Sequence, residues 1–160
     1  MAEEKAKERD MIKEYDALRK KYNLPELKEL DKEFCIGKLE ESDFLLRTVL
    51  MKMAERLEII VKSTADIIQP ESSLSSMYES EALSDDDKKK VFELLKKSSY
   101  WQKELLIREL EYSDEAAAEA INKAHKEWLV LKKEFILLLA KIKESWKSER
   151  KTKLESGYFG

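Results

Sequence analysis

The segment from about residue 115 to residue 148 carries an unbroken apolar stripe, and no other feature constrains the fold more strongly. Steps of four and three residues place its members on one face of an α-helix. At about 1.5 Å per residue such a helix would approach 50 Å in length. The stripe consists of Ala117, Ile121, Ala124, Trp128, Leu131, Phe135, Leu138 and Ile142.

A second long helix is predicted from Ser42, a suitable N-cap, to about Gln69, where Pro70 ends it. Further apolar residues, Leu45 and Val49 among them, widen its apolar face. A face this wide needs cover on more than one side, which favours a bundle over a two-stranded coiled coil. The central stripe is Leu46, Leu50, Met53, Leu57, Ile60, Thr64 and Ile67.

A third long helix is predicted from Ser84 to about Tyr112, because a hydroxyl cap precedes three aspartates in the first turn. Its expected apolar face is Val91, Phe92, Leu95, Leu105, Leu106 and Leu110. Ser98, Ser99 and Gln102 interrupt this face. They indicate close packing through small residues, a polar layer that fixes the register, or a groove that receives a partner.

The N-terminal part adds an amphipathic helix from Glu3 to about Tyr22, then a short helix from Pro25 to Phe34. With only three glycines and two prolines in 160 residues, long helices are the favoured structure. We expect one domain over residues 1–160. It would be an all-α, irregular and mostly antiparallel four-helix-type bundle with three long helices and an N-terminal helix. Residues 1–10 would fray, and 149–160 form a C-terminal tail. Residues 70–84 form a serine-rich acidic connector with room for one or two helical turns around Leu74, Met77 and Tyr78.

Several classes of protein are disfavoured by the sequence. The strongest apolar run, Phe135–Ala140, is far shorter than the roughly 20 residues that span a bilayer. The N-terminus lacks the apolar centre of a secretory signal, and the single Cys35 cannot form an internal disulfide. We therefore expect a cytoplasmic protein without a membrane partner. The scarcity of Asn and Gln among many charges is also typical of thermophile proteins.

No catalytic, cofactor-binding or metal-binding residue is predicted, and we expect no enzyme. His125 is the only histidine and has no carboxylate or thiolate one helical turn away, which indicates a half-buried packing residue rather than a ligand. Cys35 lies between Phe34 and Ile36 and is expected to pack as a small apolar side chain. The three glycines cannot form a phosphate-binding loop.

The C-terminal end differs from the rest of the chain in charge. Residues 141–160 contain six basic and three acidic residues, a net charge of +3, whereas the whole chain carries −3. A basic helix end with aromatic residues can bind phosphates or an acidic protein surface, although lysines there also complement the helix dipole. The candidate partner-binding residues are Lys141, Lys143, Trp146, Lys147, Arg150, Lys151, Lys153, Tyr158 and Phe159.

The sequence thus favours a non-enzymatic helical adaptor or regulatory subunit that binds a protein partner, with the basic C-terminal end as the contact surface. The alternative is a ribosome- or RNA-associated factor that contacts phosphates through the same lysines and Arg150. Self-association through the broad apolar faces is a third hypothesis.

Overall fold

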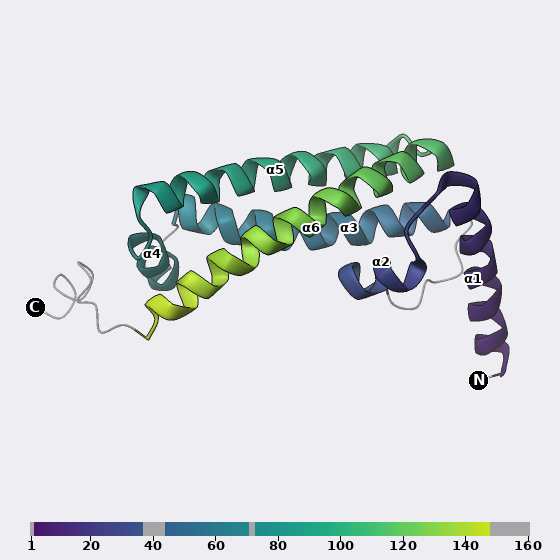
Figure 1. Ribbon diagram of the computed structural model, residues 1–160, viewed down its shortest axis with the longest axis horizontal. Coiled ribbons are helices and arrows are strands. Elements are labelled where there is room, and N and C mark those ends of the chain that lie inside the picture. The colour runs from purple at the N-terminus through teal and green to yellow at the C-terminus, as the bar shows by residue number, and fades with distance from the viewer. Residues whose placement is uncertain (1, 37–43, 71–72, 148–160) are drawn as a thin grey trace, which may run out of the picture. The chain divides into compact units, whose positions relative to one another are not determined.

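The computed structural model describes residues 2–36, 44–70 and 73–147, with side chains from residue 11 onward, and these ranges contain six α-helices and no strand (Figure 1). The chain is therefore all-α, as the periodicity predicts. The antiparallel four-helix arrangement stays a prediction. None of the described helices is long and apolar enough to cross a membrane. The helices are α1 (Ala2–Tyr22), α2 (Leu27–Phe34), α3 (Leu45–Ile68), α4 (Leu74–Glu81), α5 (Asp85–Leu110) and α6 (Asp114–Ser145).

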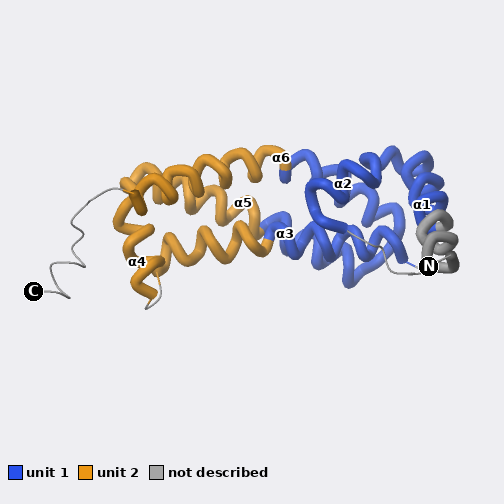
Figure 2. The backbone as a smooth tube through the Cα atoms, turned by 90° about the horizontal axis from the view of Figure 1, so that it is seen from below, with its two compact units in different colours: residues 1–57, 100–128 blue, residues 58–99, 129–160 orange. Residues whose placement is uncertain are grey.

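The chain divides into two compact units, each built from segments that are distant in the sequence (Figure 2). Unit 1 contains residues 1–57 and 100–128, and unit 2 contains residues 58–99 and 129–160. Each of the three long helices contributes a segment to both units. The single domain expected over 1–160 stays a prediction.

Two hydrogen bonds made by buried side chains position the N-terminal segments of unit 1. Tyr15 in α1 is fully buried, and its hydroxyl donates a hydrogen bond to the Pro25 carbonyl at 2.9 Å. Burial raises the pKa of Tyr15. The Trp128 indole in α6 donates to the Glu33 carboxylate in α2 at 2.8 Å, and both side chains are buried. These bonds fix the N-terminal helices of the unit because a buried polar group without a partner is costly.

Unit 2 has an apolar core to which three helices contribute. Ile67 from α3, Val91 from α5 and Ile142 from α6 form a buried cluster together with Leu83, which follows α4. Leu138 packs against this cluster while remaining partly exposed.

The stripe predicted for α3 is confirmed in full, since all seven members from Leu46 to Ile67 are at most 2 % exposed.

The start of α5 is the capping motif that its sequence predicts. The Asp87 backbone N–H donates to Ser84 Oγ at 3.2 Å, and the Ser84 backbone N–H donates to Asp87 Oδ2 at 3.2 Å. This reciprocal pair satisfies two donors that a helix start otherwise leaves free. Ser113 caps α6 in a similar way, because its hydroxyl accepts from the Ala116 backbone N–H. The N-cap expected at Ser42 lies outside the described residues.

The apolar face predicted for α5 is partly wrong. Phe92, Leu106 and Leu110 are 51 %, 36 % and 76 % exposed, whereas Leu94, which the prediction omitted, is 3 % exposed. Leucine and phenylalanine occur around much of the α5 circumference, so the spacing alone did not define which face packs. The exposed apolar residues become available for other contacts.

Candidate functional site

The structure describes four of the nine residues predicted to bind a partner. Lys141 and Lys143 lie in the last turns of α6, and Trp146 and Lys147 directly follow it. All four are exposed. The remaining candidates, Arg150, Lys151, Lys153, Tyr158 and Phe159, lie outside the described residues.

The described lysines of this end have carboxylate partners within unit 2. Lys141 pairs with Asp87 of α5. Lys143 and Lys147 both approach Glu144, at 3.7 and 3.1 Å. The two contacts with Glu144 are exposed and contribute little to stability. Together the three pairs offset much of the positive charge that the sequence places here.

Trp146 joins the end of α6 to α4. Its ring lies 4.4 Å from the Tyr78 ring, centroid to centroid, and its indole N–H donates to Glu79 Oε1 at 3.0 Å. The Tyr78 hydroxyl donates to the Ser145 carbonyl at 2.8 Å. Trp146 therefore has a packing role inside unit 2, although half of its surface stays exposed.

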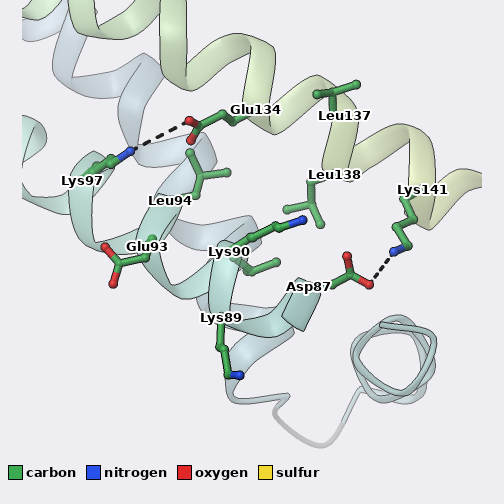
Figure 3. Close-up of a pocket in the computed structure, with 11 residues that line it drawn as sticks. Asp87, Lys89, Lys90, Glu93, Leu94, Lys97, Glu134, Leu137, Leu138 and Lys141 are labelled. Atoms are coloured by element: carbon green, nitrogen blue, oxygen red, sulfur yellow. Dashed lines mark hydrogen bonds and ion pairs between the residues drawn. The ribbon is translucent and has the colours of Figure 1, made fainter. Parts of the chain in front are cut away.

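A pocket of about 530 Å³ lies between α5 and α6 within unit 2, and we call it the α5–α6 groove (Figure 3). Its floor is apolar and continues into the core cluster through Val91 and Leu138. Charged side chains from both helices form its rim. The lining residues are Asp87, Lys89, Lys90, Val91, Glu93, Leu94, Lys97, Glu134, Leu137, Leu138 and Lys141.

Two ion pairs connect the rims of the groove, and Figure 3 draws both as dashed lines. Lys141 donates to Asp87, and Lys97 lies 3.9 Å from Glu134. The hydrogen bonds from Lys141 and from Ser84 lower the pKa of Asp87 from 3.8 to about 2. Asp87 therefore stays charged at neutral pH and holds the first turn of α5 to α6.

Beside the groove, α6 exposes a series of large apolar side chains, which we call the α6 ridge. Leu137 is 71 % exposed, Ile136 53 % and Val130 50 %. Exposed apolar side chains that adjoin one another can form a binding site for a partner. Exposed apolar side chains on α6 could have been predicted from the sequence, because the six consecutive apolar residues Phe135–Ala140 are more than one face of a helix can bury. The members of the ridge are Leu129, Val130, Ile136, Leu137 and Leu139.

In unit 1, His125 is buried rather than half-buried, at 6 % exposure, beside the Phe34 ring. Its Nε2 atom lies 3.5 Å from Glu29 Oε1 and has no hydrogen-bond partner among the described residues. The described part of the chain contains no group of three or more His, Cys, Asp and Glu side chains that could hold a metal ion.

The prediction that Cys35 packs as an apolar side chain is wrong. Cys35 ends α2 in the left-handed conformation, with φ at 51°, so its side chain is exposed while Phe34 and Ile36 on either side are buried. Arg56 of α3 supplies the basic neighbour that the local sequence did not reveal, with Nη2 3.3 Å from the sulphur.

The polar interruption of α5 has a different environment at each position. Ser98 in unit 2 is fully buried, and its hydroxyl has no hydrogen-bond partner within the described ranges. Ser99 and Gln102 are partly exposed. The burial of Ser98 favours close packing through a small residue over a satisfied polar layer.

No protein-family model, no curated protein and no solved structure matches this chain.

Proposed function

We propose that this chain is a non-enzymatic helical interaction module that binds a protein partner through unit 2. The observation that carries the proposal is the α6 ridge, whose leucine, isoleucine and valine side chains are between 37 % and 71 % exposed. Burial of such side chains on association is worth about 25 cal/mol per Å² of apolar surface before the costs of binding. The buried core of a protein–protein interface is more apolar than its rim, so side chains of this kind are suited to such a core.

The α5–α6 groove supports the same proposal. It adjoins the ridge at Leu137, which belongs to both. A partner can insert an apolar anchor side chain into the groove while its neighbouring residues cover the ridge. Anchor side chains buried in this way lie at the centre of many interfaces. The basic C-terminal end from Lys141 to Phe159 would extend this contact surface.

RNA or ribosome binding through the C-terminal cluster is less well supported. Among the six basic residues concerned, Lys141, Lys143 and Lys147 have carboxylate neighbours in unit 2. Phosphate binding at these positions would have to displace those contacts. A nucleic-acid partner also makes no use of an exposed apolar ridge, so the protein partner is the proposal that we retain.

An affinity pull-down from lysate of the native host, followed by mass spectrometry, tests the proposal. The bait proteins are the full chain, Leu137→Asp and, as a matched control, Leu110→Asp, since Leu110 is an equally exposed leucine on α5 in unit 1. We expect a discrete protein that is retained at high salt, is lost with Leu137→Asp and is kept with Leu110→Asp. Capture by all three baits alike would refute the α6 ridge as the contact surface.

A shortened chain tests the contribution of the C-terminal end. The cut should follow Lys147, because an earlier cut would remove Trp146 and its contacts with Tyr78 and Glu79. The proposal predicts an unchanged circular dichroism spectrum and weaker capture. Recovery of RNA or ribosomal proteins that disappear as salt rises would support the alternative instead. Light scattering that shows a stable dimer would assign the apolar surface to self-association.

A further inference from the structure

The charges that line the α5–α6 groove are unequally paired. Four lysines and three carboxylates line it, so the lining carries 4 − 3 = +1. Each carboxylate has a cation nearby, because Asp87 pairs with Lys141, Glu134 with Lys97 and Glu93 with Lys96. The surplus charge within the groove is therefore positive.

Lys90 carries that surplus charge. Among the lining lysines, Lys89 contacts Asp86 at 3.1 Å, whereas Lys90 has no ion pair with any residue that the structure describes. Figure 3 shows the Lys90 side chain reaching from α5 across the groove toward α6. Lys90 is exposed, so its ammonium group is accessible to an incoming carboxylate at the edge of the apolar floor.

The α5 wall of the groove runs from Asp87 to Lys97, about 15 Å, and an ion pair to α6 lies at each end of it. The apolar floor is open between these two ion pairs. An amphipathic helix that crosses this stretch can present one or two apolar anchors, one turn apart, to the floor. Leu94 and Leu138 supply that floor, and Leu137 extends it onto the α6 ridge.

We propose that the α5–α6 groove binds an acidic amphipathic helix of a partner protein, with one carboxylate of that helix paired to Lys90. This inference rests on the proposed function, since it specifies the chemistry of the partner. The partner helix must carry apolar anchors on one face and at least one Glu or Asp at the edge of that face. A basic helix would face the unpaired Lys90 and would be repelled.

A displayed library of helical peptides tests this chemistry without a known partner. Each peptide has about 14 residues, or about four turns, with leucines fixed on one face and Glu, Gln or Lys allowed at the flanking positions. Selection is run on the full chain and on Lys90→Glu. The matched control is Lys103→Glu, because Lys103 is an exposed lysine of the same helix in unit 1. Dissociation constants are then measured by fluorescence anisotropy.

We expect the full chain to select glutamate-rich peptides. Their dissociation constant should rise about tenfold with Lys90→Glu, because an attraction worth up to about fivefold is replaced by a repulsion. Lys103→Glu should bind as the full chain does. Selection on Lys90→Glu should shift the flanking positions toward lysine.

Four outcomes overturn the inference. Selection of neutral or basic peptides would exclude the carboxylate contact, and so would acidic peptides that bind Lys90→Glu as tightly as the full chain. If the binding of these peptides still depends on Leu137, the proposed function survives. A stable dimer that dissociates with Leu137→Ala would identify a second copy of this chain as the occupant. Failure to enrich any peptide would overturn this inference, whereas the pull-down with Leu137→Asp and Leu110→Asp decides the proposed function.

Discussion

Replacement of Asp87 by asparagine tests how unit 2 holds the groove together. Asp87 Oδ2 accepts hydrogen bonds from the Ser84 hydroxyl at 2.6 Å, from the Ser84 backbone N–H at 3.2 Å, and from Lys141 Nζ. Asparagine has nearly the same shape and can still accept from Ser84. It has no charge for Lys141, so the substitution isolates the ionic part of the contact between α5 and α6.

The expected loss of stability follows from the pKa of Asp87. Its fall from 3.8 to about 2 corresponds to roughly 2 kcal/mol near neutral pH, at about 1.4 kcal/mol per pKa unit. The Lys141 side chain is 54 % exposed and that of Asp87 16 %. Solvent therefore screens the pair, and we expect Asp87→Asn to lower the free energy of unfolding by about 1 kcal/mol.

The loss should depend on pH in one direction. The pKa of Asp87 is lower in the folded than in the unfolded state, so the stabilisation is present above the unfolded value of about 3.8. It disappears as the pH falls toward 2. Urea unfolding, followed by far-ultraviolet circular dichroism, should show a deficit at about pH 7 that vanishes near pH 2.

Asp86→Asn is the matched control, since Asp86 is the neighbouring aspartate, is 83 % exposed and contacts only Lys89 among the described ion pairs. It should change the free energy of unfolding by less than about 0.5 kcal/mol. A deficit of equal size at both ends of the pH range would refute the ionic account of Asp87. An equal deficit in the two variants would refute the special role of the Lys141 contact.

Substitutions at three further positions test other parts of the structure by the same unfolding measurement. Glu33→Ala should cost about 2 kcal/mol because it leaves the buried Trp128 indole N–H without its acceptor, and Glu33→Gln should recover about half of that loss. Ser98→Ala should leave stability unchanged or raise it by up to about 1 kcal/mol, since the buried hydroxyl has no partner among the described residues; a loss above about 1 kcal/mol would contradict this. Leu137→Ala should stay within about 0.5 kcal/mol of the full chain, because this side chain is 71 % exposed, and a larger loss would place it in the core.

The helices could be predicted from the sequence because burial follows periodicity when the apolar residues form one stripe. This holds for α3, where every predicted position from Leu46 to Ile67 is buried. It fails for α5, where Phe92 and Leu110 fit an apolar spacing but are exposed, and where Leu94 packs instead. The neighbouring helices decide which face of α5 is covered, and a single sequence does not contain that information.

The α5–α6 groove could not be predicted, because it depends on residues that are far apart in the chain. Asp87 and Lys141 are separated by 54 positions, and the sequence of each helix alone gives no reason to pair them. The basic neighbour of Cys35 could not be predicted for the same reason, because Arg56 belongs to another helix. The α6 ridge was partly predictable, since the run Phe135–Ala140 is too apolar for one buried face.

The most direct test of the interaction surface is site-specific photo-crosslinking in cells of the native host. A photoreactive amino acid replaces Leu137 in one protein and Leu110, the equally exposed leucine of unit 1, in another. We expect a discrete protein adduct from position 137, insensitive to ribonuclease, and none of that mass from position 110. Adducts that are identical at both positions, or none at position 137, would contradict the claim that unit 2 binds a protein partner.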